Sequence, residues 1–115
     1  MKFGICYCYW SKDWEGTDYP QTIARARKCG FDVLEIFYGR LLDMAQTEVD
    51  EIKAACKEYD VELYCCGGFD KEHDLTQKDP AARAHAIEKA KEIIKAASRV
   101  GSRNFSGINY SQWCN

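Results

Sequence analysis

Aromatic side chains gather in the loops that follow the apolar segments of this 115-residue chain. The first such loop carries Trp10 and Trp14, and the last carries Tyr110 and Trp113. Indole and phenol rings pack flat against the C–H faces of sugars, and polar groups between the rings bind hydroxyls. The pattern therefore predicts a carbohydrate-binding rim. The alternative is that these rings cap the end of a sheet as ordinary packing.

One carboxylate, Glu35, lies inside an apolar segment between Leu34 and Ile36. A carboxylate in a buried strand is costly unless it has a partner. Two interpretations stay open: Glu35 is an inward-facing polar group that supports a site, or it pairs with a Lys or Arg at the end of the sheet. The two histidines, His73 and His85, are interpreted as surface residues.

Seven cysteines offer a second chemistry: Cys6, Cys8, Cys29, Cys56, Cys65, Cys66 and Cys114. No CxxC spacing occurs, and the adjacent Cys65 and Cys66 should point to opposite faces of a strand, which disfavours joint chelation of one ion. Reduced thiols that act as small buried hydrophobes are the favoured interpretation. A zinc or redox site that uses Cys6, Cys8, Cys65 and Cys66 is the alternative.

Four short apolar segments, rich in strand-forming side chains, must position these residues. They are predicted to be strands at residues 3–9, 31–37, 61–66 and 103–108. Three helices are predicted between them, at residues 18–30, 47–59 and 79–101. Asp before Pro at the start and Gly at the end support the first and third helices.

Side-chain spacing also predicts which faces of the helices are buried. Thr47 followed by Asp50 resembles a capping pattern at the start of the second helix. In the third helix one apolar stripe is expected to face the sheet: Ile87, Ala90, Ile94, Ala97 and Val100. The charged residues Lys89, Lys91, Glu92 and Lys95 are expected to be solvated.

The alternation of strands and helices predicts an α/β fold with a parallel sheet and right-handed crossovers. Periodicity alone leaves open whether the sheet is open or part of a (β/α)₈ barrel. Neither G-x-G-x-x-G nor G-x-x-x-x-G-K-[ST] occurs, so the two phosphate-binding signatures are absent from the sequence. In parallel α/β folds, ligands bind at the carboxyl ends of the strands, where the aromatic loops lie.

Composition restricts the function classes further. A hydrophobic fraction of 46% is typical of a globular domain rather than of a disordered one. The net charge of −2 argues against a dedicated nucleic-acid binder. No apolar segment approaches the roughly 18 residues of a membrane span, and the first residues lack the apolar core of a secretory signal. We therefore expect a cytoplasmic protein, with residues 1–115 as a single unit without a linker and with no nucleic-acid or membrane partner.

Several segments resemble the ketose 3-epimerases, the D-tagatose and D-psicose 3-epimerases of the xylose-isomerase-like TIM-barrel superfamily. They are residues 1–10 with Trp14-Glu15 following, residues 30–36, residues 79–83 and residues 110–113. These segments occur in the family's order and cover essentially the whole chain. The resemblance implies the N-terminal portion of a (β/α)₈ barrel, with three strand–helix units and a fourth strand.

The resemblance also implies a pocket for a small ketose sugar. Its expected lining residues are Cys6, Trp14, Gly67, Ile108 and Trp113, with Glu35 as a supporting polar residue within the barrel. Cys6 stands where the family often has Tyr, and Cys66-Gly67-Gly68 stands where it commonly has Gly-His-Gly.

By the same resemblance, the enzyme moves a proton at C3 with two glutamates that also hold Mn²⁺, Co²⁺ or Mg²⁺. These ligands come from strands five to eight, so no catalytic or metal residue is assigned within residues 1–115. A complete barrel needs about 250 residues. The chain alone is therefore expected to be an inactive fragment that forms homo-oligomers. The alternatives are a non-catalytic half-barrel module for binding or assembly and a thiol-based metal or redox protein.

Overall fold

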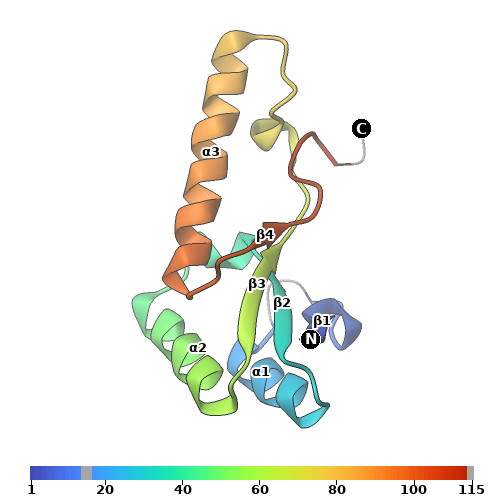
Figure 1. Ribbon diagram of the computed structural model, residues 1–115. Helices are drawn as coiled ribbons and strands as arrows, with labels where there is room; N and C mark the ends of the chain where they lie inside the picture. Colours follow the sequence, from blue (N-terminus) through green and yellow to red (C-terminus); the bar gives the residue numbers. More distant parts are fainter. Residues whose placement is uncertain (14–16, 114–115) are drawn as a thin grey trace.

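The computed structural model describes residues 1–13 and 17–113, in which four parallel strands alternate with helices (Figure 1). The strands are β1 (Gly4–Cys6), β2 (Val33–Phe37), β3 (Glu62–Cys66) and β4 (Phe105–Ser106). The helices are α1 (Tyr19–Lys28), α2 (Gln46–Tyr59) and α3 (Pro80–Arg99). The strands lie in the order β1-β2-β3-β4, so each helix connects neighbouring parallel strands. This arrangement confirms the predicted parallel α/β fold and is consistent with the N-terminal part of a TIM barrel, which the resemblance implied.

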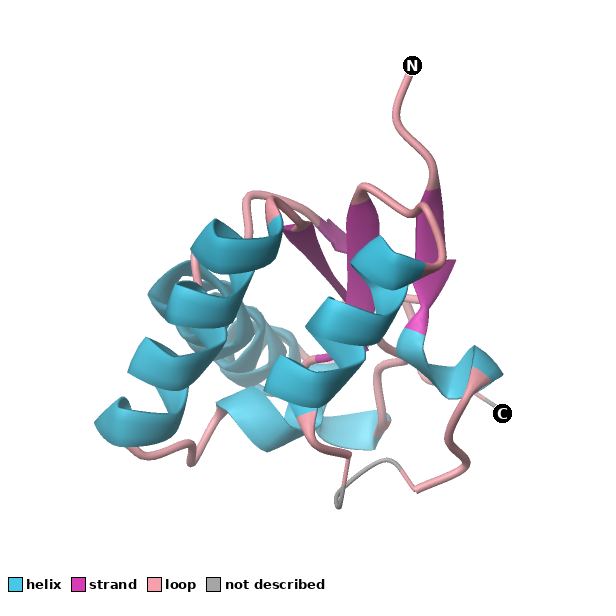
Figure 2. Cartoon of the chain, turned by 90° about the horizontal axis from the view of Figure 1, so that it is seen from below, coloured by secondary structure: helices cyan, strands magenta, loops and turns pink. Residues whose placement is uncertain are grey.

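The helices pack against one face of the sheet (Figure 2). Leu34 and Ile36 of β2 and Leu63 and Cys65 of β3 are at most 4% exposed in a core that includes residues from all three helices. Strand side chains alternate between faces, so their neighbours point the other way. In this second set Glu35, Phe37, Tyr64 and Cys66 are only half-buried. The sheet therefore has one apolar face under the helices and one more open face.

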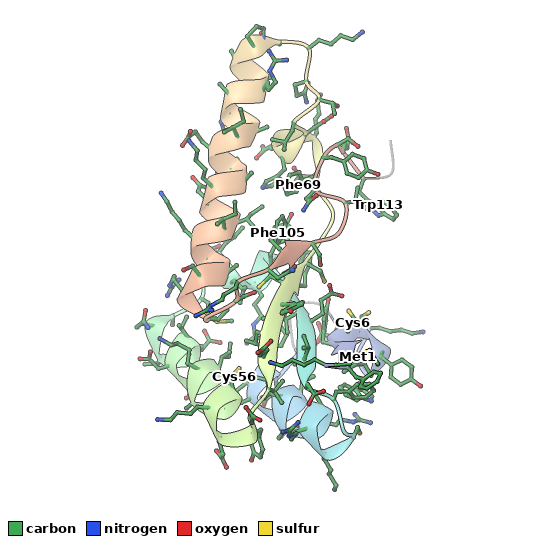
Figure 3. The ribbon with its side chains drawn as sticks, in the orientation of Figure 1. Met1, Cys6, Cys56, Phe69, Phe105 and Trp113 are labelled. Carbon is green, nitrogen blue, oxygen red and sulfur yellow. The ribbon has the colours of Figure 1, made fainter. Side chains whose placement is uncertain are left out.

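A second apolar cluster lies beyond the carboxyl end of the sheet, beside α3 (Figure 3). Phe69 stacks on Phe105 with the ring centroids 5.9 Å apart, and Tyr38 meets Phe105 edge-on at 5.6 Å. His73 lies over Phe69 and is only 9% exposed, with its Nδ1 atom 2.6 Å from Asp70 Oδ1. The surface interpretation of His73 is therefore wrong, because a short 3₁₀ turn at Lys71–His73 directs the ring inward. His85 is exposed, as expected.

The ends of α1 and α3 agree with the predicted signals. Asp18 and Asp79 accept hydrogen bonds from backbone N–H groups in the first turns of these helices. Gly30 and Gly101 follow the two helices with φ angles of +89° and +83°. Glycine adopts this backbone conformation without the penalty that a Cβ atom brings. None of the helices in the described ranges is both long and apolar enough to cross a bilayer.

The start of α2 and the buried stripe of α3 differ from the predictions. At α2, the Glu48 carboxylate accepts the backbone N–H of Ala45 at 3.4 Å, whereas the sequence suggested a cap at Thr47. In α3, Ile87 and Ile94 are 43% and 56% exposed. The side chains that α3 buries are Ala86, Ile93, Ala96 and Ala97, so of the predicted stripe Ala97 is confirmed, as is Val100 directly after the helix. The predicted stripe through Ile94 and the observed stripe through Ile93 both fit a helical period. Packing of Ile93 in the second apolar cluster selects the stripe that contains it.

The first and fourth strands are shorter than the predicted ranges 3–9 and 103–108. After β1 the chain enters a 3₁₀ turn at Tyr7–Tyr9, which carries Tyr7 into the core. There the ring of Tyr7 meets that of Tyr19 edge-on, with centroids 6.1 Å apart. Burying the Tyr7 ring in the core therefore stabilises the fold more than a longer β1 would.

We expect Asp79→Ala to lower the free energy of unfolding by about 1 kcal/mol, because it removes the acceptor for the N–H groups of Ala81 and Ala82. Asp79→Asn keeps a capping oxygen and should lose much less. Urea unfolding followed by circular dichroism measures both variants. Equal losses would contradict the capping role.

Candidate functional site

Three potential ligand side chains from three strands meet on the open face of the sheet. Strand register pairs Cys6 of β1 with Glu35 of β2, and Cys66 of β3 with Phe37 of β2. The sulfur atoms of Cys6 and Cys66 and a carboxylate oxygen of Glu35 all lie within 4.8 Å of one another. Figure 3 shows Cys6 at the end of β1, beside the sheet. The predicted site residues Cys6 and Glu35 are thus neighbours, and Cys66 joins them.

The Glu35 carboxylate has its hydrogen-bond partner on β4. Ser106 Oγ donates to Glu35 Oε1 at 2.7 Å, across a separation of 71 residues in sequence. Within residues 1–13 and 17–113, no Lys or Arg forms an ion pair with this carboxylate. The ion-pair interpretation is therefore wrong, and the role of Glu35 in supporting a site stays a prediction. Sequence reasoning missed Ser106, whose only signal is its place within the strand predicted at residues 103–108.

Burial determines the protonation of the thiols in this cluster. It raises the pKa of Cys6 to about 11, and a hydrogen bond with the Cys8 thiol, at 3.0 Å between sulfurs, adds to the shift. Burial also raises the pKa of Cys66, and the nearby charge of Glu35 adds to that effect. Both thiols are therefore protonated at neutral pH and are poor nucleophiles. Cys65 is buried on the opposite face, as the alternation along a strand predicted.

The loops after β3 and β4 run side by side and bring three predicted site residues together. Gly67 N–H donates to the Ser106 carbonyl at 3.2 Å, and Phe69 N–H donates to that of Ile108 at 2.9 Å. Trp113 N–H then donates to the Phe69 carbonyl at 2.7 Å. Gly67, Ile108 and Trp113 consequently lie along one edge.

Two glycines allow this close approach. Gly107 has a φ angle of +104°, and a Cβ atom added there would lie 2.5 Å from the carbonyl oxygen of Gly67. At Gly67, an added Cβ would lie 2.3 Å from the ring of Tyr38, whose hydroxyl donates to the Gly68 carbonyl at 3.1 Å. No side chain fits at either position without displacing backbone or a buried ring. The sequence alone did not predict this contact.

The aromatic rim is smaller than predicted. Tyr7, Tyr38 and Phe69 are at most 5% exposed and act as packing. Trp10 packs against Phe31, under the guanidinium of Arg25. Among the described aromatic residues that follow the strands, Tyr9 (77%), Tyr110 (63%) and Trp113 (57%) remain exposed. Trp14, a predicted lining residue, lies outside the described residues.

Comparison with known proteins identifies the family. The model of the xylose isomerase-like TIM barrel matches residues 23–112. The chain belongs to this family. It is 32% identical over 113 residues to the D-psicose 3-epimerase of Ruminiclostridium cellulolyticum and 31% identical over 115 residues to that of Enterocloster bolteae. The matches cover 98% of the chain, which spans about 38% of the length of these relatives.

Solved structures agree with the family. A D-psicose 3-epimerase from Clostridium cellulolyticum, determined with D-tagatose, superposes with a TM-score of 0.89 at 32% identity. Another D-psicose 3-epimerase, determined in the presence of D-fructose, gives a TM-score of 0.88 at 25% identity. Each match covers 98% of this chain and 39% of the other. The four strands and three helices therefore have the arrangement found in sugar epimerases of this fold.

Ketose 3-epimerases are generally metal-dependent, so the donors in this part of the family fold matter. Among the described residues, Cys6, Glu35 and Cys66 are the group of three that could hold an ion. Mn²⁺ and Mg²⁺ prefer oxygen ligands, whereas two of these three donors are sulfur. This set therefore does not fit the hard metal ions that the resemblance implied.

We expect Gly107→Ala to destabilise the protein more than Gly101→Ala. Both positions have positive φ, which costs about 1–2 kcal/mol for an alanine, but only Gly107 also meets backbone. The added crowding should cost roughly 1–3 kcal/mol more. Urea unfolding of both variants gives the comparison. Equal destabilisation would show that the contact with Gly67 is not constraining.

Proposed function

We propose that this chain forms one wall of the sugar pocket in a ketose 3-epimerase. The proposal rests on the open sheet face, where an inward carboxylate held by Ser106 lies near the edge formed by Gly67, Ile108 and Trp113. Matching relatives named D-psicose 3-epimerase support a ketose as the ligand class. In this proposal the two glutamates that move the C3 proton, and the Mn²⁺, Co²⁺ or Mg²⁺ they hold, come from segments outside residues 1–115.

Each proposed pocket residue has a distinct physical role. Trp113 offers an exposed indole face, next to Gly68, on which the C–H face of a sugar can pack. Gly67 adds no side chain to that edge, and Ile108 borders the edge as a half-buried apolar side chain. Cys6 and Glu35 form the floor, where the carboxylate can accept a hydrogen bond from a sugar hydroxyl. Trp14 is proposed as a second stacking residue.

These side chains position a sugar rather than transform it. Glu35 already accepts a hydrogen bond from Ser106, and the neighbouring Cys6 and Cys66 thiols stay protonated at neutral pH. Proton transfer at C3 needs a positioned acid–base group near the operating pH. The proposed role of this chain is therefore to bind and orient the ketose.

The proposed function predicts C3 epimerisation of D-fructose by the complete gene product that contains this chain, supplied with Mn²⁺ or Co²⁺. The isolated 115-residue chain should show none, because the proposed proton-transferring glutamates lie outside it. Chromatographic separation of D-fructose from its C3 epimer measures the reaction. Activity of the isolated chain, or failure of the gene product on every ketohexose tested, would overturn the proposal.

Within that gene product we expect Trp113→Ala to raise KM for the ketose by roughly fivefold, the loss of about 1 kcal/mol of stacking. Trp10→Ala is the matched control, since the Trp10 ring packs against Phe31 and Arg25 instead of facing the proposed pocket. Initial rates over a range of ketose concentrations give both values. Equal increases in KM for the two variants would show that Trp113 is not part of the sugar-binding surface.

A specific observation also favours a second candidate, a half-barrel assembly module. β1 pairs only with β2 and β4 only with β3, so each outer strand in the described ranges has an unpaired edge. Exposed strand edges promote association. Self-association would cover them and would make the chain a homo-oligomer.

We therefore expect the isolated 115-residue chain to sediment as a dimer or larger species. Analytical ultracentrifugation at several concentrations measures this. Lys or Pro substitutions in the two-residue β4 should shift the distribution toward monomer, because they disfavour edge pairing. A folded monomer at all concentrations would reject the assembly module.

The thiols are relevant to the compartment in which the protein works. Cys6, Cys8, Cys29, Cys56, Cys65 and Cys66 are all free. Free thiols persist in reducing surroundings, whereas extracellular proteins commonly form disulfides. We propose a cytoplasmic location on this basis.

A further inference from the structure

The cluster of Cys6, Glu35 and Cys66 is not explained by sugar binding alone. Carbohydrate sites need hydroxyl donors and acceptors and stacking rings, and thiols are weak in both roles. Yet two thiols and a carboxylate from three successive strands come within 4.8 Å of one another. A convergence of sulfur and carboxylate donors around one point is what a zinc-class metal site requires.

The distances are suited to a tetrahedral ion. Zinc binds cysteine sulfur at about 2.3 Å, which places two ligand sulfurs about 3.8 Å apart. The separations here all lie within 4.8 Å, so the donor atoms need to approach by only about 1 Å to reach that spacing. Ser106 donates to Glu35 and so orients the carboxylate, as an outer-shell hydrogen bond does in established metal sites.

A fourth donor lies next to the cluster. Cys8 Sγ is 3.0 Å from Cys6 Sγ. In an extended strand, residues two apart point to one face but stay well separated along it. Here β1 ends at Cys6 and the chain enters the 3₁₀ turn at Tyr7–Tyr9, which brings the exposed Cys8 thiol back toward Cys6.

The cluster can also be reached from outside the sheet. A hollow of about 290 Å³ beside the cluster is lined by Cys6 and Glu35 together with Lys2, Gly4, Ile5, Val33 and Tyr64, and the Lys2 ammonium is paired with Glu62. Glycine at position 4 adds no side chain to this hollow. An ion can therefore enter along the open face without displacing the apolar core.

We propose that Cys6, Glu35 and Cys66 bind a thiophilic divalent cation of the zinc class, with Cys8 as the fourth ligand. The sulfur donors of this site suit zinc-class ions, because hard ions such as Mg²⁺ and Mn²⁺ bind sulfur weakly. The proposal stands independently of the sugar reaction.

Cobalt is the test probe, because thiolate-bound Co²⁺ gives an intense near-ultraviolet charge-transfer absorption that oxygen-bound Co²⁺ lacks. The metal-free protein, reduced and handled without oxygen, is titrated with Co²⁺ and then with Zn²⁺. We expect one equivalent of thiolate-bound Co²⁺, displaced by Zn²⁺ but not by Mg²⁺. The complete gene product can be used in the same way, since its proposed epimerisation metal contributes no thiolate absorption.

Single substitutions assign the ligands. Cys6→Ser and Cys66→Ser should each abolish or strongly reduce the absorption, while Cys8→Ser should reduce its intensity. Cys29→Ser is the matched control, because Cys29 lies exposed at the end of α1 and should change nothing. Glu35→Gln should retain sulfur-to-metal absorption but weaken binding by roughly tenfold or more.

Far-ultraviolet circular dichroism establishes that each variant is folded, and X-ray absorption of the zinc-loaded unsubstituted protein counts sulfur ligands without any substitution. Two or three sulfurs per zinc support the site. The proposal is overturned if the folded protein shows no thiolate absorption with Co²⁺. It is also overturned if the Cys6→Ser/Cys66→Ser double variant binds unchanged.

Discussion

The contact between the backbones at Gly107 and Gly67 governs the carboxyl end of the sheet. β4 contains only Phe105 and Ser106, so its pairing with β3 supplies few hydrogen bonds. The chain then passes the Gly67 carbonyl so closely that a Cβ atom at position 107 would lie 2.5 Å from it. This approach lets parallel pairing continue beyond the strands, through Phe69 N–H to the Ile108 carbonyl. A two-residue strand thereby fixes a much longer loop.

The two faces of the sheet carry different side chains, and β4 contributes to the face that carries Glu35. On the helix face, Leu34, Ile36 and Leu63 are buried and contribute to stability through apolar packing. On the other face, β4 brings the Ser106 hydroxyl to the Glu35 carboxylate. A hydrogen bond to a charged group contributes about 1.5–3 kcal/mol, which offsets part of the cost of placing a carboxylate there. The position of β4 therefore gives the Glu35 carboxylate its hydrogen-bond partner on the inner face.

Local signals predicted the element order and most boundaries. Asp18, Asp79, Gly30 and Gly101 act within one turn of their own position, and the structure confirms all four at helix ends. Because such signals act locally, the alternation of strands and helices also followed from the sequence, and with it the parallel fold.

Features that depend on distant segments were not predictable in this way. Ser106 and Glu35 are 71 residues apart, and no local pattern links them. His73 lies in a charged stretch that is typical of a surface loop, but the rings of Phe69 and Tyr38 bury it. In α3, Ile94 and Ile93 fit the helical period equally well, and only the cluster around Phe69 selects Ile93. Tertiary packing decided each of these cases.

The thiol at position 6 links the two proposals for the inner face. A phenol, which the resemblance leads one to expect there, would extend over the hollow lined by Cys6, Glu35 and Tyr64. A cysteine is shorter, so it leaves that space open and places sulfur within 4.8 Å of the Glu35 carboxylate and the Cys66 thiol. A sugar hydroxyl and a zinc-class cation would both use the Glu35 carboxylate, which is already engaged on one oxygen by Ser106. The two ligands would therefore compete for one group, so occupancy of the thiol site by a cation would weaken ketose binding at the same face.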